Sequence, residues 1–157
     1  MRVFEASPDF ADWNSVLLLL QSAFAYMDGR IDPPSSLRRL DVDELRAKAR
    51  QQSLILAISG DALVGCALAE VRGDCVYVGK VAVATEYRGR GVARQLLATA
   101  ESIARRRGLR VLELQTRVEL VENHQTFAAL GFKKTGETTH HGYTRPTSIT
   151  MRRCIAS

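Results

Sequence analysis

Residues 88–93 form a segment rich in arginine and glycine, between an apolar strand-like run and an amphipathic helix-like run. The segment reads Arg-Gly-Arg-Gly-Val-Ala, follows the β-branched residues 75–83, and precedes apolar residues at helical spacing up to residue 104. A turn that opens a helix exposes backbone N–H groups that have no partner inside the helix. With the helix dipole, those groups bind phosphate. The segment therefore predicts a phosphate-binding site flanked by two arginines.

The composition is that of an ordinary globular protein. The chain has 157 residues, a net charge of +5, 46% hydrophobic residues and 6% aromatic residues. This length suits one domain over residues 1–157. The charge favours an anionic ligand, but the few aromatic residues count against a nucleic-acid surface. The arginine run at 105–107 fits the end of a helix, so we expect no nucleic-acid partner.

The N-terminal residues 2–6 already read as a strand, so we expect no signal peptide. The longest leucine run, 17–20, is far too short to span a membrane. The three cysteines, Cys66, Cys75 and Cys154, lack metal-ligand spacing, and we expect small buried side chains and no metal. We therefore expect a cytoplasmic protein with no membrane partner.

The elements that must position the glycine segment follow from the apolar patterning. The order is β-α-α-β-β-β-α-β-α-β-β, which predicts an α/β (α+β) fold with a mixed, mostly antiparallel, twisted sheet of about seven strands and helices on both faces. The strands are expected at 2–6, 53–59, 62–71, 75–83, 111–116, 132–139 and 147–153, and the other helices at 41–52 and 121–130. The first helix is expected from the Ser7-Pro8-Asp9 signal to about residue 27, with a buried stripe of Trp13, Val16, Leu17, Leu20 and Phe24. Residues 28–40 are expected to form a long loop, and long loops in compact domains are often functional.

Three segments carry a family resemblance. Arg88, Gly91 and Ala93 match the spacing Arg/Gln-x-x-Gly-x-Gly/Ala, the strand before them ends in Val81-Ala82-Val83, and residues 127–132 read Phe-Ala-Ala-Leu-Gly-Phe. In this order they resemble the GNAT superfamily of acyl-CoA-dependent N-acetyltransferases. Motif similarity covers about residues 75–132.

The resemblance implies a site for acetyl-CoA as cosubstrate, without a metal. Backbone amides of Gly89, Arg90, Gly91, Val92 and Ala93 would hold the pyrophosphate, with charge added by Arg88 and Arg90. The strand carrying Val81, Ala82 and Val83 would diverge from the strand at 112–116 so that pantetheine fills the opening. A backbone N–H near Val81 or Val83 would polarise the thioester carbonyl.

Two positions depart from the family pattern. The tyrosine that often protonates the departing thiolate is replaced by Phe127, which has no proton to donate. The asparagine expected seven residues earlier falls on Leu120. Asn123, one helical turn further on, would either substitute for that asparagine or cap the helix.

The general base has several candidates. They are Tyr77 on the strand before the glycine segment, Glu119 and Glu122 after the next strand, and His140, His141 and Tyr143 in the last hairpin loop, which also carries Arg145. Deprotonating a lysine-type amine (pKa ~10.4) at neutral pH costs roughly 4 to 5 kcal/mol, and an α-amino group near ~8 costs about 1. A site without an obvious base therefore favours a less basic amine.

The leading hypothesis is an N-acetyltransferase that transfers acetyl from acetyl-CoA by direct attack in a ternary complex. The acceptor would be a small-molecule or peptide amine, chosen with the help of the loop at 28–40 and its Arg30 and Asp32. The alternative, favoured by Phe127, is a non-catalytic acyl-CoA-binding sensor. The resemblance also implies a possible homodimer.

Overall fold

One mixed sheet organises the part of the chain that the computed structural model describes, residues 1–155. Its seven strands lie in the order β1-β2-β3-β4-β5-β7-β6, and only β4 and β5 are parallel neighbours. The elements, in chain order, are β1 (Arg2–Glu5), α1 (Trp13–Ala23), η1 (Ala25–Met27), η2 (Ser36–Arg39), α2 (Val42–Ala49), β2 (Ser53–Ser59), β3 (Ala62–Arg72), β4 (Cys75–Val83), η3 (Thr85–Tyr87), α3 (Val92–Arg106), β5 (Val111–Arg117), α4 (Val121–Ala129), β6 (Lys133–Thr138) and β7 (Ser148–Cys154). The predicted fold class is confirmed.

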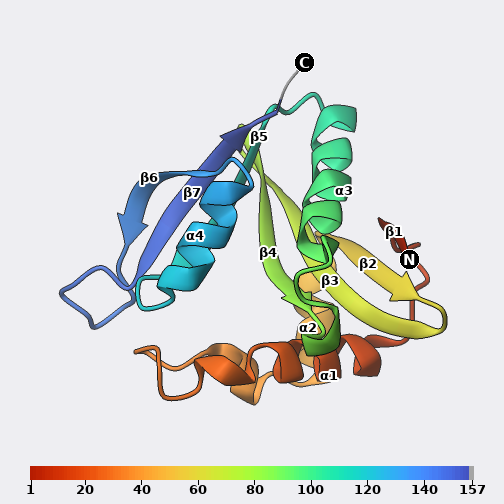
Figure 1. Cartoon of the computed structure of the whole chain (residues 1–157), viewed down its shortest axis with the longest axis horizontal. Helices are drawn as coiled ribbons and strands as arrows, with labels where there is room; N and C mark the ends of the chain where they lie inside the picture. The colour runs from red at the N-terminus through yellow and green to blue at the C-terminus, as the bar shows by residue number, and fades with distance from the viewer. Residues whose placement is uncertain (156–157) are drawn as a thin grey trace.

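Helices cover the two faces of the sheet with separate cores (Figure 1). On one face, α3 residues such as Leu96 and Leu97 pack with Val76 and Leu112, and α4 packs beside them. On the other face, α1 and α2 cover the apolar side chains of β2 and β3. Figure 1 shows α3 and α4 on the two sides of an opening between β4 and β5.

The first helix differs from its predicted bounds at both ends. It begins at Trp13 because the Asp12 carboxylate accepts the Ser15 N–H (3.3 Å) and caps the helix, so the expected start at residues 7–9 is wrong. It ends at Ala23 and a short 3₁₀ helix follows. Its buried residues are Val16, Leu19, Leu20 and Ala23, whereas Trp13, Leu17 and Phe24 are only partly buried. The predicted cap of the second helix is confirmed, since Asp41 accepts the Glu44 N–H at 2.8 Å.

A bulge interrupts β4 where it faces the opening. The register with β3 shifts between Cys66 and Leu68, so that Lys80 and Val81 both lie opposite Ala67. Lys80 has φ 50° and is the one non-glycine residue with positive φ in residues 1–155. Such a backbone conformation costs free energy and commonly marks functional positions.

Gly65 sets how closely the first turn of α3 approaches the sheet. A Cβ at this position would lie 2.8 Å from Val92 Cγ1 and 3.3 Å from the Ala82 carbonyl oxygen. We expect Gly65→Ala to destabilise the fold by about 1–3 kcal/mol through overpacking, measured by urea denaturation. Gly136→Ala in β6 is the matched control, because a Cβ there meets nothing within 4 Å. An equal loss of stability in both variants would contradict this account.

Candidate functional site

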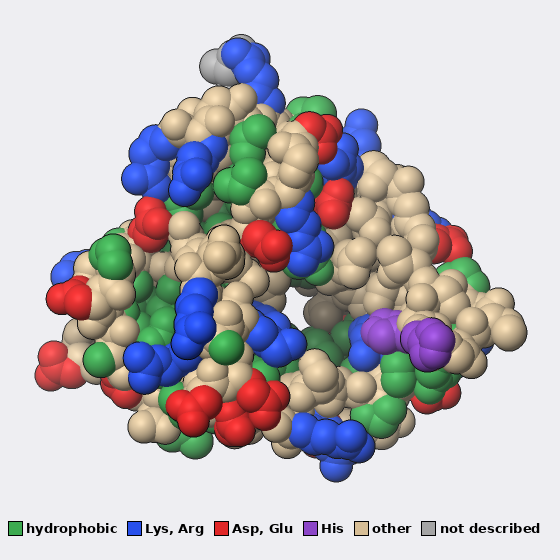
Figure 2. All heavy atoms as spheres, turned by 180° about the vertical axis from the view of Figure 1, so that it is seen from behind, with side chains coloured by type: hydrophobic (Ala, Val, Ile, Leu, Met, Phe, Trp, Pro, Cys, Tyr) green, Lys and Arg blue, Asp and Glu red, His purple; other side chains and the backbone are tan. Residues whose placement is uncertain are grey.

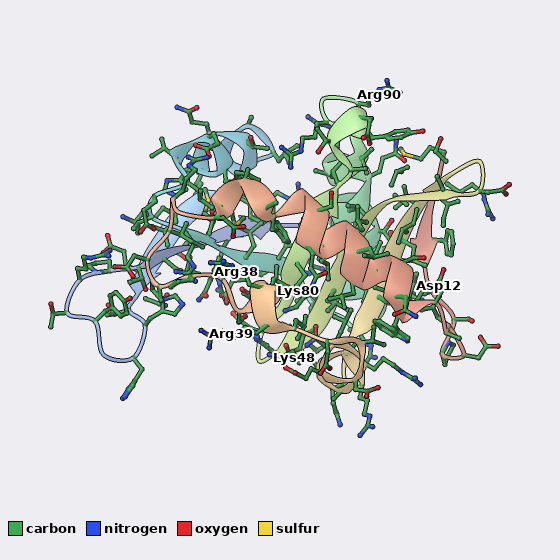
Figure 3. All side chains as sticks on the ribbon, turned by 90° about the horizontal axis from the view of Figure 1, so that it is seen from below. Asp12, Arg38, Arg39, Lys48, Lys80 and Arg90 are labelled. Atoms are coloured by element: carbon green, nitrogen blue, oxygen red, sulfur yellow. The ribbon has the colours of Figure 1, made fainter. Side chains whose placement is uncertain are left out.

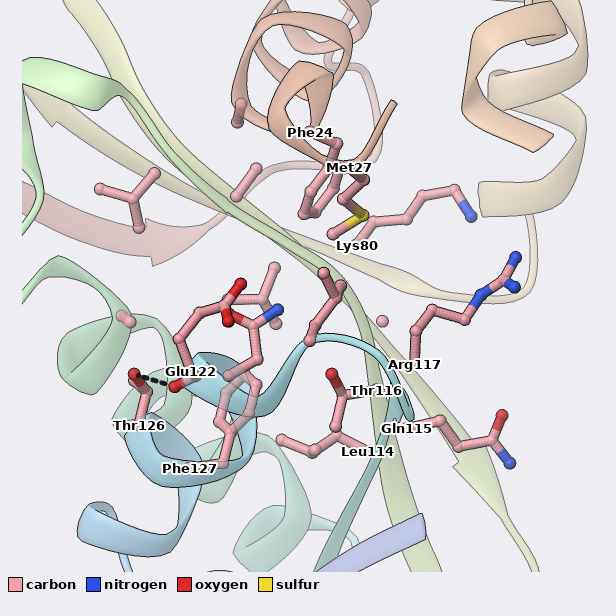
Figure 4. Close-up of a pocket in the computed structure, with 18 of the residues that line it drawn as sticks. Phe24, Met27, Lys80, Leu114, Gln115, Thr116, Arg117, Glu122, Thr126 and Phe127 are labelled. Carbon is pink, nitrogen blue, oxygen red and sulfur yellow. Dashed lines mark hydrogen bonds between the residues drawn. The ribbon is translucent and has the colours of Figure 1, made fainter. Parts of the chain in front are cut away.

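A cavity of about 1120 Å³ lies where β4 and β5 separate. The two strands pair only at Val76–Leu112 and Tyr77–Glu113 among the described residues, so β4 has no neighbour on that side beyond residue 77. The cavity is lined by both faces of β5, since Leu114 and Thr116 alternate with Gln115 and Arg117 (Figure 4). It is therefore a passage through the sheet, and Figure 2 shows a deep hollow at one of its ends.

The N-terminus of α3 forms one wall of the passage. Gly89 (φ 76°) and Gly91 (φ 80°) adopt left-handed conformations, and Gly91 occupies the N-cap position. Within residues 1–155, the backbone N–H groups of residues 89–94 have no hydrogen-bond acceptor. Free N–H groups at a helix N-terminus attract an anion, as the glycine segment predicts.

The two arginines of the segment are held differently. Arg88 donates from Nη2 to the Ala23 carbonyl oxygen (2.9 Å), and its guanidinium lies 5.2 Å from the centre of the Tyr26 ring. Arg88 thus links the glycine segment to the end of α1 while it lines the cavity. Arg90 lies over the Tyr87 ring and does not line the cavity. The other predicted coenzyme-binding residues line it: Val81, Ala82, Val83, Gly89, Gly91, Val92, Ala93, Asn123 and Phe127.

Tyr26 brings a hydroxyl to the wall that holds Phe127. Asn123 lies in the first turn of α4 and does not cap it, because the N-cap is Leu120. Its Nδ2 donates to the Tyr26 hydroxyl oxygen at 3.1 Å. Phe127 follows one turn later and packs edge-on against Phe132. Sequence reasoning missed Tyr26, because 97 residues separate it from Asn123 and nothing local to it indicates a site.

The candidate bases are dispersed rather than gathered. His140 lines the cavity, contacts the Thr147 hydroxyl through Nδ1, and has a pKa lowered first by burial and then by Arg117. His141, Glu119 and Tyr143 do not line it. Tyr77 lines it beneath Arg72 (3.9 Å), and burial raises its pKa, which makes the phenol a poor base.

Glu119 and Tyr143 instead join three loops at Asp32. The Tyr143 hydroxyl donates to Asp32 Oδ1 (2.5 Å), and Arg145 bonds Oδ2 (3.2 Å). The Asp32 N–H donates to Glu119 Oε2 (3.1 Å). We call these contacts the Asp32 tie. The bond to Asp32 raises the pKa of Tyr143, which further disfavours it as a base.

Residues 1–155 contain neither a membrane-spanning helix nor a cluster of metal ligands. No helix there combines the length and apolar character needed to cross a membrane. No group of three or more His, Cys, Asp or Glu residues there could hold a metal ion. Cys66 and Cys75 are buried, as expected, whereas Cys154 is exposed.

Known proteins resemble this chain in sequence and in fold. The profile of the "Acetyltransferase (GNAT) family" matches residues 13–132. Similar solved structures include the ribosomal-protein-S18-alanine N-acetyltransferase of Escherichia coli (19% identity, 99% of this chain and 96% of that one, TM-score 0.73). The PaiA N-acetyltransferase of Thermoplasma acidophilum in complex with coenzyme A is also similar (14% identity, 98% of this chain and 99% of that one, TM-score 0.77). A third similar structure is an aminoglycoside 6′-acetyltransferase type Ii (20% identity, 100% of this chain and 99% of that one, TM-score 0.75). No curated protein matched the sequence significantly.

Proposed function

The chain belongs to the acetyltransferase (GNAT) family and is an acyltransferase by that membership, and from this premise we propose that it transfers acetyl from acetyl-CoA directly to a primary amine. The observation that carries the proposal is the set of free N–H groups at residues 89–94, which open onto a passage between two diverging strands. The amine and acetyl-CoA would bind together, one from each end of the passage.

The chemistry of the passage fits the coenzyme along its length. Residues 89–94 offer N–H donors for the pyrophosphate, and the unpaired edge of β4 from Val78 to Val83 offers main-chain groups for pantetheine. The Thr116 hydroxyl is buried without a hydrogen-bond partner in residues 1–155 and lines the cavity, so it is available to a ligand. Bound acetyl-CoA would supply the thioester that the amine attacks. The N–H of Val81 or Val83 would stabilise negative charge on its carbonyl oxygen.

Tyr26 is our candidate for the acid that protonates the departing thiolate. The Asn123 amide donates to its oxygen, which leaves the hydroxyl proton free for another acceptor. Its place beside the wall with Phe127 supports this role, because Phe127 itself has no proton to give. A hydroxyl from η1 would thus do the work that the family often assigns to α4.

His140 is our candidate for the group that accepts the amine proton. Its lowered pKa keeps the imidazole neutral at pH 7, and a neutral imidazole can take up a proton directly or through water. Its position on the cavity wall supports this assignment over the adjacent His141.

The pH dependence of kcat/KM follows from this assignment. As pH falls, His140 becomes protonated around a pKa below 6.5 and can no longer act as a base, so kcat/KM is expected to fall through that range. His140→Gln is expected to lower kcat/KM by roughly 10- to 100-fold at pH 7 and to remove the inflection. His141→Gln is expected to keep the inflection. A retained inflection in His140→Gln would rule out this role.

Release of free thiol from acetyl-CoA in the presence of an amine library tests the function as a whole. Thiol release and a mass increase on the amine support an acetyltransferase. Tight coenzyme binding without release across the library would instead support an acyl-CoA sensor, the alternative that Phe127 favours.

A further inference from the structure

Arg117 presents a buried, unsatisfied donor to the passage. Its Nη1 is buried and has no hydrogen-bond partner in residues 1–155, and its side chain forms no ion pair there. Burial lowers its pKa, while Glu119, Tyr143 and Asp32 act against that shift without contacting it as ion-pair partners. A buried N–H donor without a partner costs free energy, and a bound anion would remove that cost.

Lys80 adds a second cation from the bulge in β4. It lines the same cavity, and no carboxylate pairs with it among the described residues. Burial and the neighbouring Lys48 both lower its pKa, as expected of an ammonium group held without a counter-ion. Figure 4 shows the side chains of Lys80 and Arg117 extending to the same side, away from Phe127 on α4.

Three carboxylates around this end of the passage are already paired with arginines. Glu122 pairs with Arg30 (2.7 Å), Asp32 with Arg145 (3.2 Å), and Asp28 with Arg38 (3.7 Å). Glu119 accepts the Asp32 N–H through Oε2, while its buried Oε1 has no partner in residues 1–155. Glu119 therefore offsets part of the field of Arg117, but no carboxylate in residues 1–155 forms an ion pair with Arg117 or Lys80.

More cations lie outside the same opening. Figure 3 shows Arg38, Arg39 and Lys48 on the same side of the molecule as Lys80, and Figure 2 shows lysine and arginine side chains bordering the hollow. Such a field attracts anions and repels polycations before contact.

We propose that the acceptor is an amine that also carries an anionic group, a carboxylate or a phosphate, and that Arg117 and Lys80 bind this group. This inference rests on the proposed acetyl transfer. A guanidinium suits the bidentate binding of either anion. The same charges disfavour polyamines and other polycationic amines.

The test compares kcat/KM for matched amines with and without an anionic group, calculated on the unprotonated amine because the α-amino group of an amide is less basic than that of the acid. α-Amino acids and aminoalkylphosphonates are measured against amino-acid amides and diamines, with acetyl-CoA saturating. The anionic amines are expected to have a kcat/KM roughly 10- to 100-fold higher than the amides. Whichever of the carboxylate and phosphonate amines has the higher kcat/KM identifies the anionic group of the acceptor. Arg117→Gln and Lys80→Gln are expected to reduce the acid-to-amide ratio toward one, with partial recovery in Arg117→Lys. Arg110→Gln, at the opposite end of β5, is the control and should preserve the ratio.

Binding gives a readout that does not depend on turnover. With coenzyme A present, N-acetyl amino acids are expected to bind in calorimetry at least roughly tenfold more tightly than N-acetyl amino-acid amides, and Arg117→Gln should abolish the difference. Equal binding of acid and amide, preference for diamines, or an unchanged ratio in Arg117→Gln would overturn the inference. If the chain binds coenzyme but acetylates no amine, the proposed transfer fails, and the calorimetry still decides whether an anion binds at Arg117.

Discussion

Tyr26→Phe is expected to lower kcat by roughly 100-fold, the range typical of losing a positioned general acid. The substitution removes one hydroxyl and leaves the ring that Arg88 and Arg30 contact. The N–H groups of residues 89–94, which we propose hold the coenzyme, are untouched, so the Kd of acetyl-CoA should stay nearly the same. Single-turnover kinetics with a reactive amine separates this loss from slow product release.

A double variant makes the expectation specific. Phe127→Tyr returns a hydroxyl to the α4 wall, where the family often has one, and in the Tyr26→Phe background it is expected to recover much of the lost rate. A merely structural role for Tyr26 would give no such recovery. An unchanged kcat in Tyr26→Phe would show that the thiolate leaves without an acid from this residue.

Gly91→Glu is expected to weaken acetyl-CoA binding by on the order of 100-fold or more. At φ 80° a side chain costs about 1–2 kcal/mol, and relief of this strain would turn the N–H groups of residues 89–94 away from the ligand. A carboxylate at this position also repels the pyrophosphate that the N–H groups would hold. Isothermal calorimetry with acetyl-CoA measures the loss.

Gly60→Glu is the matched control for backbone strain. Gly60 has φ 60° in the turn between β2 and β3, and, as at Gly91, a Cβ there meets nothing within 4 Å. Both variants should lose similar stability in thermal unfolding, but Gly60→Glu should bind acetyl-CoA normally. Equal loss of affinity in the two would mean that strain, and not the anion site, determines the result.

Local chemistry made most of the fold predictable. The patterns predicted β2 and β4 at the residues where they occur, since an apolar run next to the Gly60-Asp61 turn and a β-branched run after Gly73-Asp74 have few alternatives. The start of α1 was predicted wrongly because Ser7-Pro8-Asp9 and Asp12 are both acceptable caps. Tertiary contacts of Val16 and Leu20 with the sheet favour the later one.

The two ends of the candidate site also differ in how far the sequence predicts them. The proposed coenzyme end is built from residues that are neighbours in the sequence, so the glycine segment alone indicates it. The acceptor end depends on residues that meet only after folding, such as Asn123 with Tyr26 and Asp32 with Tyr143. The sequence could not distinguish His140 from His141 either. The two histidines are adjacent, and only the folded hairpin loop brings His140 to the cavity wall.

A passage that crosses a sheet has two entrances, and this has a consequence for the order of events in a catalytic cycle. The coenzyme would enter and leave beside α3, whereas the amine and its product would pass on the side of Lys80 and Arg117. Neither substrate then blocks the route of the other. In the proposed mechanism, the divergence of β4 from β5 would thus separate the exchange of the coenzyme from the exchange of the acceptor, so that spent coenzyme could be replaced while the next amine is already bound.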